Sequence, residues 1–305
     1  MHIRQLAIAG IIATTLTTSA FADGIPQTVD RLTAHVETLE ARIASLEALL
    51  TDIYRGTDPQ TGQDTLQFSG MNVQIVNGSG FSDFNTIPNG TGNLIIGYNE
   101  PNTTGQPSER TGSHMLVVGF GQNYTSFGGI VAGADNTTHG AWSSVLGGTE
   151  NTASGAVSTI TAGRGNSADS FSASVSGGLN NAATGVFSSV SGGLSNRAEG
   201  PVSTVSGGSD NAVFGEVSSI LGGIGNSING YRATIAGGEN NFVGGYAATV
   251  SGGFGNGSHN DHSTVAGGRN NTAAATGATV SSGQYKIAAS EGCAAGDSVP
   301  DGGGC

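Results

Sequence analysis

The sequence predicts an all-β solenoid, a parallel β-roll whose rungs are each fifteen residues long. An asparagine, a glycine and a β-branched apolar residue each recur at every fifteenth position between Ile130 and Gly283. The repeat keeps its phase without insertions, and such strictness is typical of a solenoid. The asparagine column comprises Asn136, Asn151, Asn166, Asn181, Asn196, Asn211, Asn226, Asn241, Asn256 and Asn271. The apolar column comprises Ile130, Val145, Ile160, Val175, Val190, Val205, Ile220, Ile235, Val250, Val265 and Val280.

Each repeat contains two short extended segments. In the first, as in residues 203–206, the apolar residue stands between Ser or Thr residues, an alternation suited to a strand. The second follows the asparagine, and glycines that can adopt positive φ separate the two. Its inward position is small and apolar, at Ala153, Ala168, Ala183, Ala198, Val213, Ile228, Val243 and Ala273.

The asparagine column has two interpretations. It is either an array that faces a ligand or ice, or a ladder that bonds its own turns and the neighbouring asparagines. We favour the ladder because the asparagine always follows the glycine turn. The Ser and Thr residues beside the apolar column suggest ice or sugar binding, but Leu146, Leu221 and Ala236 interrupt that surface. Calcium-binding rolls repeat every nine residues with a regular aspartate, so the sequence does not imply calcium.

The segment from Ser144 to Gly155 and its copies resemble the head repeats (Hep/Hag) of YadA-type trimeric autotransporter adhesins of bacteria. The resemblance covers about half of the chain and implies a left-handed parallel β-roll that assembles as a homotrimer. It also implies a surface-exposed, non-catalytic adhesin. The order of parts differs from that family, because here the coiled coil precedes the roll, and no recognisable membrane anchor follows it.

Residues 1–22 have the pattern of a secretory signal peptide. A short basic start precedes an apolar run from Leu6 to Leu16, and Ala20 and Ala22 form an Ala-x-Ala cleavage site. The run is short and contains Gly10, which argues against a membrane anchor. We therefore expect an exported protein, secreted or at the cell surface.

Residues 23–55 predict a coiled-coil helix, because apolar residues from Val29 to Ile53 alternate in steps of three and four. The a and d residues of the first heptads favour a dimer, and those of the last favour more strands. The segment from Arg42 to Glu47 resembles a motif of short trimeric coiled coils, so we favour a trimer. The predicted trimerisation residues are Val36, Leu39, Arg42, Ile43, Leu46 and Glu47.

The segments that flank the regular roll have weaker patterns. We expect a linker at residues 56–65, irregular first rungs with a cap at 66–129, and the regular repeats at 130–285. The loops at 77–92 and 99–112 are long insertions. They are either capping loops or recognition surfaces.

The C-terminal part departs from the repeat. His259, Asp261 and His262 suggest a metal site, but no third histidine lies within sequence reach, and an irregular outer coil explains them equally well. We expect a flexible tail at 286–305. Its Cys293 and Cys305 can form a disulfide after export, within one chain or between chains.

Composition excludes several functions. Only 10% of the residues are charged and the net charge is −12, which argues against nucleic-acid binding. No nucleophile elbow, phosphate loop or zinc-protease motif occurs, so we expect no enzyme, cofactor or metal. The sequence therefore predicts a structural or adhesive trimer whose partners are itself and an unidentified matrix, cell-surface or polysaccharide ligand; the alternative is a carbohydrate- or ice-binding solenoid. The candidate contact aromatics are Trp142, Phe171, Phe187, Tyr231 and Tyr246.

Overall fold

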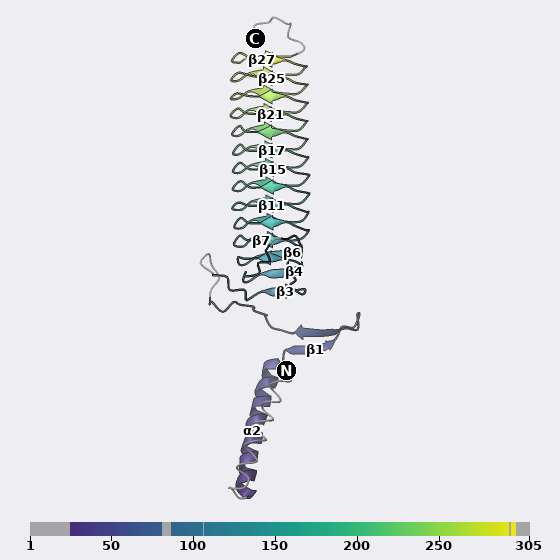
Figure 1. Cartoon of the computed structure of the whole chain (residues 1–305), viewed down its shortest axis with the longest axis vertical. Coiled ribbons are helices and arrows are strands. Elements are labelled where there is room, and N and C mark those ends of the chain that lie inside the picture. Colours follow the sequence, from purple (N-terminus) through teal and green to yellow (C-terminus); the bar gives the residue numbers. More distant parts are fainter. Residues whose placement is uncertain (1–24, 81–86, 106, 293, 297–305) are drawn as a thin grey trace. The chain divides into compact units, whose positions relative to one another are not determined.

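The computed structural model describes residues 25–80, 87–105, 107–292 and 294–296 (Figure 1). The chain divides into two compact units, one up to Gln74 and one from Ile75. The expected signal peptide at residues 1–22 lies outside the described residues, and so do Cys293 and Cys305. Within the described part of the chain, no helix has the length and hydrophobicity that crossing a membrane requires.

The first unit consists of one helix and one hairpin. Helix α2 (Ile25–Leu50) begins with Pro26 in its first turn, where a missing N–H costs nothing. Strands β1 (Ile53–Thr57) and β2 (Asp64–Phe68) pair antiparallel, with Ile53 opposite Phe68. This differs from the linker expected at 56–65 and from the roll segment expected to begin at residue 66.

The turn at Asp58 explains the hairpin. Asp58 Oδ1 accepts hydrogen bonds from the N–H groups of Thr61 (2.7 Å) and Gln60 (3.0 Å) and from the Thr61 hydroxyl (2.9 Å). The bonds from Thr61, followed by that from Gln60, hold the pKa of the Asp58 carboxyl below its usual value. An Asx turn of this kind reverses the chain locally and leaves no periodic pattern in the sequence.

The second unit is a parallel β-solenoid of about 12 turns, stacked one on another (Figure 1). Each regular turn contributes one short strand to each of two parallel sheets, and a single β-bridge joins it to the next turn at a third place. The 14-stranded sheet comprises β3 (Leu94–Ile96), β4 (Leu116–Phe120), β6 (Ile130–Ala134), β8 (Ser144–Val145), β10 (Thr159–Ile160), β12 (Ser174–Val175), β14 (Ser189–Val190), β16 (Thr204–Val205), β18 (Ser219–Ile220), β20 (Thr234–Ile235), β22 (Thr249–Val250), β24 (Thr264–Val265), β26 (Thr279–Val280) and β28 (Ala294–Ala295).

The 12-stranded sheet contains the second strand of each turn. It comprises β5 (Asn123–Tyr124), β7 (Thr137–Thr138), β9 (Thr152–Ala153), β11 (Ser167–Ala168), β13 (Ala182–Ala183), β15 (Arg197–Ala198), β17 (Ala212–Val213), β19 (Ser227–Ile228), β21 (Phe242–Val243), β23 (Gly257–Ser258), β25 (Thr272–Ala273) and β27 (Ile287–Ala288).

In the regular turns the core is one narrow column between the two sheets, and a separate cluster of Met115, Val117, Tyr124 and Val131 fills the first turns. In each regular turn the apolar residue of the first strand, such as Val205, is fully buried, while its Ser or Thr neighbour remains partly exposed. The small apolar residue of the second strand, such as Val213, is buried opposite. Burying a valine or isoleucine stabilises by about 1.5–3 kcal/mol, so each turn has a thin but continuous core.

The apolar column is shifted by one residue at its start. Val131, not Ile130, pairs with Val145 and is fully buried, while Ile130 pairs with Ser144 and stays partly exposed. The prediction for Ile130 was therefore wrong. The reason is spacing. One residue separates Val131 from Gly133, whereas two residues separate Val145 from the equivalent glycine of the next turn, Gly148.

Candidate functional site

Helix α2 presents an apolar stripe that none of the described residues covers. None of its residues is buried. The side chains of the stripe are 42–57% exposed, at Val29, Leu32, Val36, Leu39, Ile43, Leu46 and Leu50. Arg42 and Glu47 are also exposed. A helix with heptad-spaced apolar side chains of this kind is stable in water only when another helix covers them.

The asparagine column lies inside the solenoid. Asn151 is fully buried, and its backbone N–H donates to Asn136 Oδ1 at 2.9 Å. Its Nδ2 donates to the carbonyl oxygens of Gly147 (3.3 Å) and Gly163 (2.9 Å). The other asparagines of the column repeat this arrangement, and each is at most 1% exposed. The side chains are therefore used by the fold and are not accessible to a ligand.

At each end of the asparagine column, a residue other than asparagine completes the hydrogen bonding, and the sequence analysis missed both residues. Gln122 Oε1 accepts the N–H of Asn136 at 3.1 Å, in the place of an earlier asparagine. At the other end, the Lys286 N–H donates to Asn271 Oδ1 at 2.9 Å. A side-chain amide fourteen residues before Asn136 was a signal that could have identified Gln122.

The predicted contact aromatics lie on a single corner of the solenoid, at the turn after each second strand. Phe171 and Phe187 meet edge to face with ring centroids 5.5 Å apart, and Phe187 is 55% exposed. Trp142 packs on Phe127 in the same manner at 5.3 Å. With the exposed valines of intervening turns they form what we term the apolar corner: Trp142, Val157, Phe171, Val186, Phe187, Val202, Val217, Tyr231 and Tyr246.

The backbone of the apolar corner is strained. Val157, Val202 and Val217 have φ values of 59°, 56° and 55°, in a region that β-branched residues rarely occupy. The stacking of turns fixes this conformation, because the N–H of Val217 donates to the Pro201 carbonyl of the preceding turn at 2.9 Å. The repeat thus holds exposed apolar side chains where the backbone conformation is unfavourable in free energy.

The tyrosines of the corner form a small cluster with Arg232 and His262. Tyr231 and Tyr246 stack at 5.6 Å, and the Arg232 guanidinium lies 5.2 Å from the Tyr231 ring centroid. A side-chain hydrogen bond with Tyr231, and the negative charge of this tyrosine when it is ionised, raise the pKa of the Arg232 guanidinium. His262 packs edge-on against Tyr246 at 5.4 Å.

The sequence suggested a metal site near this cluster, but the structure separates its members. The His259 ring packs on the Phe242 ring with centroids 5.4 Å apart, and Asp261 Oδ1 accepts a hydrogen bond from the Tyr246 N–H at 2.9 Å. Over the described residues, no three His, Cys, Asp or Glu side chains are placed to hold a metal ion. These contacts account for the three residues as parts of an outer coil.

The Ser and Thr column of the 14-stranded sheet is only half exposed. Ser144, Thr159 and Ser174 are intermediate in exposure, whereas Leu146 and Leu221 beside the column are 46% and 56% exposed. A surface for ice needs a flat and regular array of hydroxyl groups. The protruding leucines make this face irregular.

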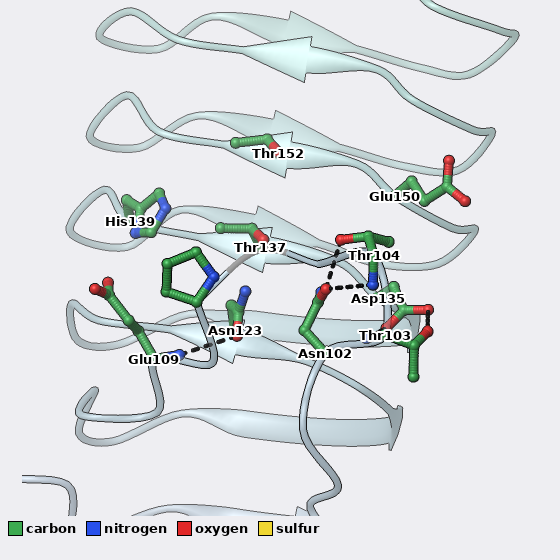
Figure 2. A pocket seen from close by; sticks show the side chains of 11 residues that line it. Asn102, Thr103, Thr104, Glu109, Asn123, Asp135, Thr137, His139, Glu150 and Thr152 are labelled. Carbon is green, nitrogen blue, oxygen red and sulfur yellow. Dashed lines mark hydrogen bonds between the residues drawn. The ribbon is translucent and has the colours of Figure 1, made fainter.

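A pocket of about 760 Å³ lies where the described residues of the 99–112 loop, 99–105 and 107–112, cross the outer face of β5, β7 and β9 (Figure 2). Thr103 holds the loop through Asp135, donating its N–H (2.9 Å) and its hydroxyl (2.7 Å) to the two carboxylate oxygens. Asn102 Nδ2 donates to the Gly121 carbonyl at 3.1 Å. The lining residues are Asn102, Thr103, Thr104, Pro107, Glu109, Asn123, Asp135, Thr137, His139, Glu150 and Thr152.

The pocket is polar and acidic. Its lining includes three carboxylates, those of Glu109, Asp135 and Glu150. Arg164 donates two hydrogen bonds to the Glu150 carboxylate, from Nη2 to Oε1 (3.0 Å) and from Nε to Oε2 (3.1 Å), and partly neutralises its charge. These bonds raise the pKa of the Arg164 guanidinium. His139 Nδ1 lies 2.8 Å from the Thr125 hydroxyl. The loop was singled out from the sequence, but the strand residues that complete the pocket were not.

Comparison with models of known protein families finds no match, and a search of the curated proteins finds no significant relative.

Proposed function

We propose that this protein is a secreted or cell-surface adhesion protein, a homotrimer that presents its solenoid for multivalent attachment. The observation that carries the proposal is the apolar stripe of α2, whose side chains are 42–57% exposed in the single chain and require partner helices. The likeness of the repeats to YadA-type head repeats supports three chains and a left-handed roll, and the fifteen-residue period of the sequence supports fifteen-residue rungs. The predicted signal peptide supports export.

The repetition of the solenoid supports multivalent binding. The apolar corner presents similar exposed side chains on successive turns, so one chain offers the same weak contact many times. Three chains multiply it again, and linked weak contacts raise the overall affinity without any new type of contact. Matrix proteins, cell surfaces and polysaccharides are extended, repetitive ligands that suit such an array.

Two variants of α2 test this function. Ile43→Lys with Leu46→Lys places charges on the apolar stripe, while Ala44→Lys with Ser45→Lys adds the same charge to the opposite face of the helix. Mass photometry should give three chains for the wild type and the control pair, and one chain for the stripe variant. Only the stripe variant should lose retention on whole cells and immobilised polymers.

A folded wild-type monomer would contradict the assembly. Equal retention of the wild type and of the monomeric stripe variant would contradict the role of multivalency. That second result would favour the other candidate function, a carbohydrate-binding solenoid. The stacked rings of Tyr231, which is partly exposed, and Tyr246, which is exposed, support this candidate, because sugars bind on aromatic faces.

A further inference from the structure

The pocket beneath the 99–112 loop is lined by a nearly buried polar side chain whose donor group has no partner among the described residues. Asn123, on β5, is only 3% exposed and lines the pocket. Its Oδ1 accepts the backbone N–H of Glu109 at 3.1 Å, and this bond fixes which end of the amide is the acceptor. The Nδ2 group then points into the pocket (Figure 2), where none of the described residues accepts a hydrogen bond from it.

The Asn123 side chain is nearly buried, but its Nδ2 group is open to the pocket, where the acceptor atom of a ligand can bond it. Here the donor faces a pocket of about 760 Å³, a volume within the range of small-ligand sites. A ligand with an acceptor atom would complete the bonding of Asn123. This is independent of the trimer and of the apolar corner.

The other groups around the pocket define the ligand. The hydroxyls of Thr137 and Thr152, on adjacent strands β7 and β9, face the same space as Asn123 and have no partner among the described residues. The carboxylate of Glu109 accepts hydrogen bonds but cannot donate them when ionised. The pocket therefore offers donors and acceptors side by side, as a ligand rich in hydroxyl groups requires.

Charge and polarity exclude the other small ligands. Three carboxylates around the pocket repel phosphate, sulfate and acidic sugars. Pro107 is the only apolar residue of the lining, so an apolar ligand would gain little. A metal ion is not favoured, since the described carboxylates and histidine do not converge on one point and Asn123 presents a donor.

We propose that this pocket binds a neutral saccharide through its hydroxyl groups. The Asn123 amide donates to one sugar oxygen, the hydroxyls of Thr137 and Thr152 bond adjacent positions, and Glu109 accepts from a sugar hydroxyl. Asp135 and Arg164 act indirectly, because Asp135 holds Thr103 of the loop and Arg164 positions Glu150.

The test uses the full chain on an array of neutral hexose and N-acetylhexosamine oligosaccharides, printed beside sialylated and sulfated ones. Asn123→Asp keeps the acceptor for the Glu109 N–H and replaces only the donor that faces the pocket. Thr137→Val removes one hydroxyl and keeps the strand-forming shape. The control, Asn180→Asp, makes the same charge change on an exposed turn in a column where Asp135 and Asp210 already stand.

We expect binding to neutral glycans only. Asn123→Asp should weaken it about tenfold or more and Thr137→Val about two- to tenfold, while Asn180→Asp leaves it unchanged. Denaturant unfolding checks each variant, and if Asn123→Asp does not fold, Thr137→Val decides. The proposal is overturned if no neutral glycan is retained or if the folded pocket variants bind like the wild type. It is also overturned if calcium chloride alone binds at Glu109, with binding lost in Glu109→Gln, and no glycan does.

Discussion

Replacing one asparagine of the ladder, Asn211→Ala, should destabilise the solenoid by about 2–4 kcal/mol. The side chain removed accepts the N–H of Asn226 at 3.0 Å and donates to the Gly207 carbonyl at 3.0 Å. The buried N–H of Asn226 has no alternative partner, which costs about 1–3 kcal/mol, and the partly buried Gly207 carbonyl adds about 1 kcal/mol. The Gly223 carbonyl also loses its bond from Asn211 Nδ2, but it keeps one from the Ser209 N–H and therefore adds little to the loss of stability.

Hydrogen exchange measures this effect where it arises. In a solenoid each turn contacts only its neighbours, so the loss should be local, and the Asn226 amide should exchange faster while amides far along the stack keep their protection. Asn229→Ala is the matched control, because Asn229 is exposed and makes no side-chain bond. If Asn211→Ala and Asn229→Ala gave the same protection and the same unfolding midpoint, the ladder would not be structural.

Three further substitutions probe the core, the strained corner and the tight turn, each by urea unfolding. Val205→Asp places a carboxylate in the fully buried column and should cost about 4 kcal/mol or more; an unchanged midpoint would mean that the column is hydrated. Val217→Asn should stabilise by about 1 kcal/mol, because asparagine tolerates φ near 55° and the exposed valine packs little; destabilisation would show that its side chain is in contact. Gly208→Ala should cost about 2 kcal/mol or more, because its φ is 90° and an added Cβ would overlap the Gly223 carbonyl oxygen; a neutral result would contradict the turn geometry.

The solenoid was predictable because its bonding pattern repeats with its sequence. Each buried valine, asparagine and alanine stands in a column that the spacing reveals. The first turns were harder, since Ile130 and Val131 are adjacent and both β-branched. Alternation alone cannot choose between them, whereas pairing with Val117 of the preceding turn places Val131 inward. The hairpin after α2 was missed because Asp58 creates it through local turn bonds.

The pocket could be predicted only in part. Loop length indicated that residues 99–112 were a candidate recognition surface, but not where the loop folds back. That position depends on contacts between residues distant in sequence, such as Thr103 with Asp135, thirty-two positions apart. Asn123 gave no signal, because its burial results from the loop that covers it and not from its strand.

The uniform bonding of the regular turns bears on how such a chain can change during evolution. Asn211 bonds Asn196 fifteen positions earlier, in the same way that Asn196 bonds Asn181. Removing residues 196–210 would bring Asn211 onto Asn181 with every bond type preserved, and duplicating them would be equally harmless. Unequal recombination between such similar repeats can thus lengthen or shorten the protein by whole turns. The length of the solenoid is then adjustable without any redesign of the fold.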